Sequence, residues 1–346
     1  MKRYLAIAGI LVLLAGFAAF FAAQQYSRFL ATPLSLPVEA YVIQIEPGTS
    51  GSTIIKHLAG SGFTRYSWQW RLLMRLEPPA VKTGEYRLEP GIKPRELLQL
   101  LSSGAVVQYR FTLVEGWTFK QLLQALAKDD VLKQTPDQGS SAAGDEAGTV
   151  LISGLGIDHP EGWFFPETYQ FTRGDSAADI LARAHQAMEK ELGSAWEVRN
   201  AGLPLNTPYQ LLILASIIEK ETGKEEERGQ IAGVFIRRLH QGMRLQTDPT
   251  VIYGMGDAFD GNIRRRDLKT DTPYNTYTRS GLPPTPIAMP GRASLLAAAQ
   301  PLAGDALYFV ANGTGGHTFS ATLQEHREAV NKFIKIQGKL KGRRKK

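Results

Sequence analysis

Residues 4–23 dictate the start of the fold, because none of them carries a charge and they directly follow Lys2 and Arg3. As a helix, twenty residues rise about 30 Å, which is the thickness of the hydrocarbon core of a bilayer. A cleaved signal peptide is the alternative, but the run is long for one and has no clear small-x-small cleavage site. The sequence therefore predicts a single transmembrane anchor. By the positive-inside rule, residues 1–3 stay in the cytoplasm and the chain after residue 24 lies on the opposite side.

The composition of the 346-residue chain indicates globular domains after this anchor, with 43% hydrophobic and 21% charged residues. The chain has no cysteine, which excludes disulfides, thiolate zinc sites and a cysteine nucleophile. Its net charge is +7, but residues 332–346 carry eight basic residues and no acid, so the rest of the chain sums to −1. A nucleic-acid partner is therefore not expected. The basic tail, residues 338–346, is either a solvated terminus or a binder of polyanions or anionic lipid headgroups.

One pattern occurs three times in the first half of the chain. It consists of a strand end, a glycine turn, a capping stretch and a short amphipathic helix. The copies "IEPGTSGSTIIKHL", "LEPGIKPRELLQLL" and "LVEGWTFKQLLQAL" align without gaps on Gly48, Gly91 and Gly116. Strands rich in β-branched and aromatic residues are expected to lead into them at residues 41–45, 84–88 and 106–113, and a further helix is expected at residues 68–76.

These elements divide the chain into domains. Residues 24–39 are expected to form a linker, and residues 40–108 a small module with the order strand, helix, helix, strand. In order and size this module resembles LysM, a fold that binds glycans containing N-acetylglucosamine, but a packing module that spaces a second domain from the membrane has the same order. Residues 109–337 are expected to form a second α+β domain. Within it, residues 134–148 have no apolar periodicity, which predicts a mobile surface loop.

Five glutamates end the apolar segment "LLILASIIEKETGKEEERG", residues 211–229. Residues 211–222 predict a helix with its N-cap and first turn among residues 206–208, and residues 226–241 predict a second helix, so that the two form a helical hairpin. Glu225, Glu226 and Glu227 fall in the connection or in the first turn of the second helix, where acidic side chains interact favourably with the helix dipole. All three are expected at the surface.

Glu219 and Glu221 differ from these three, because seven of the eight residues before Glu219 are apolar. The two acids lie on different faces of the predicted helix, each beside apolar residues. Helical periodicity does not choose between them. It indicates that at least one lies close to apolar packing, where desolvation raises the pKa of a carboxyl and suits it to general acid catalysis at an acetal oxygen.

Other common chemistries have no matching pattern in the sequence. The six histidines form no ligand pair on one helical face, so neither a metal nor another cofactor is expected. No G-x-S-x-G motif marks a serine nucleophile. The glycine-rich "NGTGGH", residues 312–317, lacks the lysine of a phosphate-binding loop and is expected to form a hairpin turn.

Two polar segments follow the helical hairpin, "MRLQTDPTVIYG" and "TPYNTYTRSGLPPTPIAMPG". Their amides and hydroxyls can form hydrogen bonds with sugar hydroxyls and acetamides, and their tyrosine rings offer flat faces to pyranose rings. Turn formation is the alternative role for any one of these residues. The residues predicted to bind a glycan are Gln246, Asp248, Tyr253, Asn275 and Tyr277.

Short motifs in this half of the chain are similar to those of the endolytic murein transglycosylases, the YceG-like family. They are "ASIIEKET", "RLQTDPTVIYG", "YNTY", "GLPPTPIAMPG" and "GGHTF", and the similarity runs from about residue 40 to about residue 337. The resemblance implies one inner-membrane span and a periplasmic domain that cuts peptidoglycan glycan strands internally. It also implies that Glu219, the first glutamate of the E-K-E motif, is catalytic, and it adds His317 to the glycan-binding residues. The loop at residues 134–148 and the basic tail depart from the family pattern.

The reaction implied by the resemblance is lytic. Glu219 protonates the glycosidic oxygen between N-acetylmuramic acid and N-acetylglucosamine, and then takes the proton of the muramic acid 6-hydroxyl as that oxygen attacks C1. A 1,6-anhydro end results. The family also implies partnership with glycan-polymerising synthases and a role in ending nascent strands.

Two other functions remain open on the sequence alone. The first is a hydrolytic muramidase, which needs two carboxylates and would use Glu219 with Asp248. Asp248 otherwise orders its T-D-P-T turn or binds a sugar. The second is a non-catalytic scaffold that binds peptidoglycan through the LysM-like module.

Overall fold

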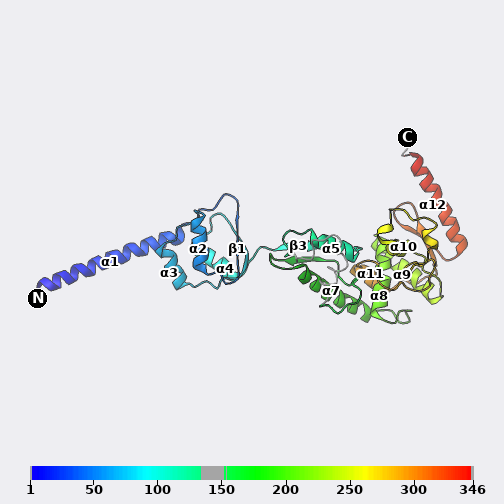
Figure 1. The fold of residues 1–346 in the computed structure, drawn as a ribbon, viewed down its shortest axis with the longest axis horizontal. Coiled ribbons are helices and arrows are strands. Elements are labelled where there is room, and N and C mark those ends of the chain that lie inside the picture. The colour runs from blue at the N-terminus through cyan, green and yellow to red at the C-terminus, as the bar shows by residue number, and fades with distance from the viewer. Residues whose placement is uncertain (1, 134–151, 153, 344–346) are drawn as a thin grey trace. The chain divides into compact units, whose positions relative to one another are not determined.

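The structure, a computed structural model, describes residues 2–133, 152 and 154–343 (Figure 1). These residues form two compact units. Unit 1 contains the chain up to Tyr109 together with Gln170–Gly174, and unit 2 contains Arg110–Tyr169 and the chain from Asp175 onward. The loop predicted at residues 134–148 lies outside the described residues.

Unit 1 begins with helix α1, Lys2–Ala31, whose segment Arg3–Ala31 is long and apolar enough to cross a membrane. The helix continues past residue 23, so the prediction of a linker was wrong for residues 24–31. Tyr26, Phe29 and Leu30 of this extension pack against the core of unit 1, and the ring centroid of Phe29 lies 5.1 Å from that of Trp70. This packing stabilises helical turns that an isolated linker would not form.

The rest of unit 1 has the predicted order of strand, helix, helix and strand. Strand β1, Tyr41–Ile45, pairs antiparallel with β2, Gly84–Leu88, with Tyr41 opposite Leu88 and Ile45 opposite Gly84. Helices α2, Gly51–Gly60, and α3, Trp68–Leu76, connect the two strands, and α4, Pro94–Ser103, follows them. The apolar faces of these elements form one core around Trp70 and Tyr86, both fully buried.

The threefold repeat is confirmed, and its third copy belongs to unit 2. Gly48, Gly91 and Gly116 have φ angles of 79°, 93° and 74°, the left-handed region that glycine reaches without a steric penalty. In each copy the helix N-cap lies two residues after the glycine, at Ser50, Lys93 and Thr118. The aligned apolar positions are buried in the helices α2, α4 and α5, Phe119–Ala127, except that Leu123 is half-buried.

Unit 2 is mainly helical. Strand β3, Tyr109–Thr112, pairs with β4, Thr168–Phe171, and each of these strands has residues assigned to both units. The expected hairpin is formed by β5, Tyr308–Ala311, and β6, His317–Ser320, and Phe309 and Phe319 of this hairpin pack against the helical core. The helices are α7, Ala177–Glu197; α8, Pro208–Glu221; α9, Glu225–His240; α10, Asp248–Met255; α11, Arg292–Ala299; and α12, Leu323–Arg343, with short 3-10 turns at Gly256–Ala258 and Asp267–Lys269. A mixed α and β fold is therefore confirmed.

Helix α8 lies at the centre of this unit, because every residue from Leu211 to Ile218 is buried. Helices α7, α9 and α11 pack around it (Figure 1). Its N-terminus is the predicted one, since the side chain of Thr207 accepts a hydrogen bond from the backbone N–H of Gln210 at 3.2 Å and Pro208 occupies the first turn. The buried hydroxyl of Ser216 accepts a bond from the backbone N–H of Ile287 at 3.0 Å, which holds the proline-rich segment 281–291 against the helix.

One further expectation differs from the structure. The T-D-P-T segment is not a turn, because Asp248 is the first residue of α10 and Pro249 lies in its first turn. The backbone of α12 is helical to Arg343, which lies inside the predicted basic tail, residues 338–346.

The glycine turns give a paired test of backbone strain in unit 1. Both Gly48 and Gly60 have open space where a Cβ atom would lie. They differ in backbone conformation, because Gly48 has a left-handed φ of 79° and Gly60 does not have a left-handed φ. We expect Gly48→Ala to destabilise the module by about 1–2 kcal/mol, because an L-residue pays that cost in the left-handed region. Gly60→Ala should leave stability unchanged or raise it by up to about 1 kcal/mol. Hydrogen exchange at the amides of α2 measures both effects, and equal losses in the two variants would contradict the explanation.

Candidate active site

Glu219 lies in the last turn of α8, where its carboxylate faces the start of α11. The Oε2 atom accepts hydrogen bonds from the backbone N–H of Gly291 at 3.0 Å and from the hydroxyl of Ser294 at 2.7 Å. The side chain is only 6% exposed. Its Oε1 atom has one longer contact, 3.5 Å to Nη2 of Arg228 on α9. Among the described residues, Oε2 is therefore held by two donors, and Oε1 has one longer contact with a guanidinium.

A second carboxylate, Glu115, shares the same guanidinium. Its Oε2 lies 3.9 Å from Nη2 of Arg228, whose side chain is 10% exposed. Burial and the negative charge of Glu219 raise the pKa of Glu115, and the positive charge of Arg228 opposes both effects. The sequence analysis did not select Glu115, although it directly precedes Gly116 in the third copy of the repeat. Its glycine turn brings it to α8.

The β3–α5 turn is tied to α8 by the residue after Glu219. Nζ of Lys220 donates to the backbone oxygen of Gly116 at 3.1 Å. The same turn pairs with the proline-rich segment, since the backbone N–H of Gly116 donates to the oxygen of Met289 at 2.8 Å. Three segments far apart in the sequence thus surround the end of α8.

Glu161 is a buried acid that the sequence analysis missed. It accepts hydrogen bonds from the backbone N–H of Phe119 at 3.0 Å and from the hydroxyl of Tyr253 at 3.1 Å. Burial raises its pKa to about 7, despite the opposing effect of these bonds and of the nearby charge of Lys220. The available signal was its place in "HPEGWFF", where aromatic residues surround one carboxyl.

Glu221 confirms the expectation that at least one of the two helix acids lies near apolar packing. Burial raises its pKa to about 7, the negative charge of Asp248 adds to this effect, and a hydrogen bond from the hydroxyl of Thr247 opposes it. Two residues along a helix correspond to a rotation of about 200°. Glu221 therefore faces α10, whereas Glu219 faces α11.

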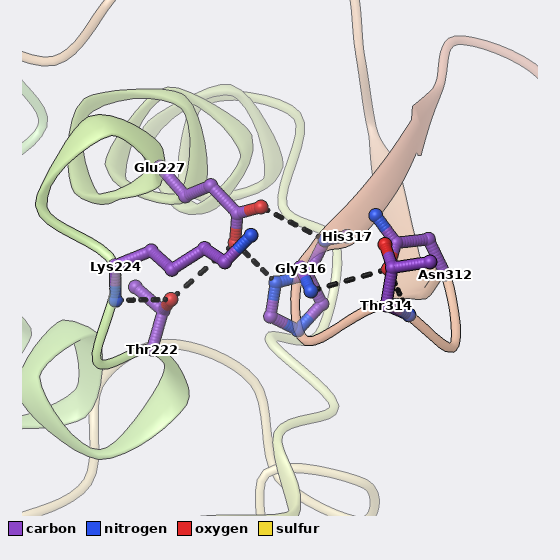
Figure 2. Close-up of polar contacts among 7 residues, drawn as sticks. All are labelled: Thr222, Lys224, Glu227, Asn312, Thr314, Gly316 and His317. Atoms are coloured by element: carbon purple, nitrogen blue, oxygen red, sulfur yellow. Dashed lines mark hydrogen bonds and ion pairs between the residues drawn. The ribbon is translucent and has the colours of Figure 1, made fainter.

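The expectation for Glu227 was wrong, while Glu225 and Glu226 are exposed as predicted. Glu227 is buried, and its two oxygens contact the backbone N–H of His317 at 2.9 Å and Nδ1 of the same residue at 2.7 Å (Figure 2). Burial favours a higher pKa, but the hydrogen bonds and charge of His317 outweigh it and hold the pKa of Glu227 below its ordinary value. Sequence spacing failed because the partner is distant in the chain.

The residues predicted to bind a glycan do not form one cluster with Glu219. Asp248 accepts a 2.6 Å hydrogen bond from the hydroxyl of Tyr277, and its charge acts on Glu221 rather than on Glu219. Tyr253 is bonded to Glu161. Gln246 is the one non-glycine residue with a positive φ, 51°, in the described part of the chain.

Asn275 has an internal role in its loop. It is fully buried, and its Nδ2 lies within hydrogen-bonding distance of three backbone oxygens, the shortest being 2.7 Å to Thr270. Its Oδ1 accepts from the backbone N–H of Tyr277 at 2.9 Å. These contacts order the loop, and they leave its amide no accessible surface for a sugar.

Among the residues that the structure describes, no group of three or more His, Asp or Glu side chains is placed to hold an ion.

The chain is similar to known proteins in sequence and in structure. A family model described as the YceG-like family matches residues 43–332. The chain belongs to the YceG-like family. All the motifs quoted above from this YceG-like protein, and also Glu115 and Glu161, lie within the matched range.

Relatives agree with this assignment over most of the chain. The endolytic murein transglycosylase of Bacillus subtilis (strain 168) is 33% identical over 327 residues, which cover 89% of each chain. That of Streptococcus pneumoniae serotype 2 (strain D39) is 28% identical over 273 residues, covering 71% of this chain and 49% of the relative. A yceG-like protein of Listeria monocytogenes, known from its crystal structure, has a TM-score of 0.51 and 31% identity, covering 84% of this chain and 99% of that one.

The buried acid Glu161 of this YceG-like protein predicts a pH-dependent stability. An unfolded glutamate loses its proton near pH 4.5, whereas folded Glu161 keeps it up to about pH 7. The folded state binds more protons between these values, so stability falls as the pH rises, by about 3 kcal/mol for this group. We expect Glu161→Gln to reduce the fall between pH 5 and pH 8, since the amide does not ionise. Denaturant unfolding at several pH values measures the slope, with the exposed Glu226→Gln as control. Equal slopes in wild type and Glu161→Gln would contradict the assignment.

Proposed function

We propose that this YceG-like protein is a lytic transglycosylase that cleaves the glycan strands of peptidoglycan internally, with Glu219 as its catalytic residue. Family membership and the names of the relatives from Bacillus subtilis and Streptococcus pneumoniae support the reaction class. The surroundings of Glu219 are the observation that supports its assignment as the catalytic residue. It is a nearly buried carboxylate with one oxygen held by Gly291 and Ser294 and the other directed at Arg228.

The first step is protonation of the glycosidic oxygen between N-acetylmuramic acid and N-acetylglucosamine. Glu219 in its protonated form donates from Oε1, and the bond from the muramic acid C1 to that oxygen breaks. N-acetylglucosamine leaves as an alcohol, with the proton of Glu219 on its oxygen. Positive charge develops at C1, and the carboxylate that has formed at Glu219 lies where it can stabilise this charge.

The second step closes a ring within the muramic acid. Its 6-hydroxyl oxygen attacks C1, Glu219 takes the hydroxyl proton, and a 1,6-anhydro end forms. Glu219 is thereby returned to its protonated form without consumption of water. The nucleophile is tethered to the sugar that it attacks, so most of its positioning entropy has already been lost and one carboxyl is sufficient.

The anchor and unit 1 suggest where this reaction takes place. Helix α1 is suited to an inner-membrane anchor, with residues 1–3 in the cytoplasm and the chain after residue 24 in the periplasm by the positive-inside rule. The βααβ order of unit 1 supports a LysM-like module over residues 40–108 that binds the same glycan, ahead of the catalytic domain at residues 109–337. Cleavage near the membrane suits a role in ending nascent strands beside glycan-polymerising synthases.

A pair of isosteric variants tests the catalytic residue. We expect Glu219→Gln to keep the fold and to lower the rate of glycan release from isolated peptidoglycan by about 10²–10⁴-fold or more, because the amide cannot donate and accept the proton. Glu221→Gln is the control from the same helix turn. It should retain most of the activity, because its side chain faces α10 and an amide resembles the protonated carboxyl. Normal release of anhydro-ended glycans by Glu219→Gln would overturn the proposal.

Hydrolysis is the second candidate, and the structure favours Glu115 over Asp248 as its second carboxylate, because Glu115 shares Arg228 with Glu219. Mass spectrometry of the products separates the two reactions. Hydrolysis adds one water per cut and the lytic reaction adds none. We expect anhydro masses for wild type and for Glu115→Gln, and reducing ends that carry added water would instead support hydrolysis.

A further inference from the structure

Glu227 holds His317 at two points, its backbone N–H and its imidazole. One carboxylate oxygen accepts from the backbone N–H of His317 at 2.9 Å, and the other contacts Nδ1 at 2.7 Å (Figure 2). The second oxygen also accepts from the hydroxyl of Thr222 at 3.3 Å. A buried carboxylate with three donors has a defined position, so the imidazole that it contacts is also fixed.

This contact determines which ring nitrogen of His317 remains available to bind a ligand. A carboxylate only accepts hydrogen bonds, so Nδ1 carries the proton that lies between the two side chains. Figure 2 shows the other ring nitrogen, Nε2, on the side of the ring away from Glu227. No hydrogen-bond partner of Nε2 occurs among the described residues, and the side chain is 16% exposed.

The glycine-rich hairpin is shaped to keep the two residues in contact. A Cβ atom on Gly316 would overlap Oε1 of Glu227 and would lie 2.9 Å from Nζ of Lys224. Gly316 is itself held by the side chain of Asn312, whose Oδ1 accepts from the backbone N–H of Gly316 at 3.1 Å. The segment "NGTGGH" is thus more than a connection between β5 and β6, because its last glycine allows Glu227 to reach His317.

The surroundings of His317 suit a carbohydrate. The ring of Phe309 meets the imidazole edge to face at 5.3 Å between centroids. A fixed polar nitrogen beside an aromatic ring is suited to orient sugar hydroxyls and acetamido groups.

We propose that Glu227 is a positioning residue for a glycan-binding subsite, in which Nε2 of His317 bonds a hydroxyl or acetamido group of the polymer. The class of ligand rests on the proposed function. Among the described residues the hydrogen-bond partners of Glu219 are Gly291, Ser294 and Arg228, and neither Glu227 nor His317 is one of them, so the subsite contributes to binding and not to proton transfer. Loss of the Glu227 contact lets the imidazole rotate and exchange tautomers, which weakens the bond at Nε2.

Binding in an inactive background tests the subsite separately from catalysis. Full-length Glu219→Gln protein in detergent is mixed with purified peptide-free glycan strands, and the Kd is compared after adding Glu227→Gln, Gly316→Ala or His317→Ala. Each change should weaken binding about tenfold, which is about 1.4 kcal/mol. The matched control is Gly223→Ala, in the α8–α9 connection, where a Cβ has open space and φ is not left-handed. It should bind like the parent.

Two further measurements exclude a merely structural effect. Glu227→Gln combined with His317→Ala should lose no more than either change alone, because both act through one bond. Nitrogen NMR should show Nδ1 protonated in the parent and the proton distributed over the two ring nitrogens in Glu227→Gln, with Tm changed little.

Each outcome decides for or against the subsite. Binding within twofold of the parent for Glu227→Gln and Gly316→Ala, or additive losses in the double variant, would overturn it.

In the active Glu219 protein the same changes should raise KM with little change in kcat, and a fall in kcat at constant KM would also count against the subsite. If the active protein releases no glycan while the binding losses appear as expected, the proposed function fails and the subsite stands.

Discussion

Burial of α8 on all sides is the constraint from which the rest of unit 2 follows. A helix that is apolar around its whole circumference must be covered everywhere, and α7, α9 and α11 provide that cover. Its charged residues are then confined to its last turn. Lys220 is exposed, whereas Glu219 and Glu221 must find partners at the edge of the core, because an unpaired polar group at a buried position is costly.

The carboxyls around this turn have different partners, and their different chemistry follows from that. Glu221 and Glu161 accept hydrogen bonds from neutral donors, so burial dominates and their pKa values rise to about 7. Glu227 has an imidazole and a backbone N–H, which hold its pKa down. Glu219 has a guanidinium beside one oxygen and two uncharged donors at the other. The four acids thus have three kinds of environment.

The predictions that succeeded depend on local physics. Gly48, Gly91 and Gly116 take left-handed φ angles because the same turn precedes each short helix, and the Thr207–Pro208 start of α8 follows from capping preferences. Those that failed depend on contacts between distant segments. Glu227 was expected at the surface because it starts a helix, yet the hairpin at residues 312–317 buries it. The helical extension of α1 to Ala31 depends on Trp70, which the local sequence of the linker does not reveal.

The sequence by itself determined a membrane-length apolar helix, a repeated strand–glycine–helix unit and an apolar helix ending in acids. Each of these depends only on the spacing of neighbouring residues and on their backbone preferences. Motif similarity pointed to Glu219 within that helix. Only the tertiary structure decided that Glu115 shares Arg228 with Glu219, that Glu161 is buried against Tyr253, and that Glu227 holds His317. Pairing and desolvation set the behaviour of a carboxyl, and both depend on residues that are distant in the chain and adjacent only after folding.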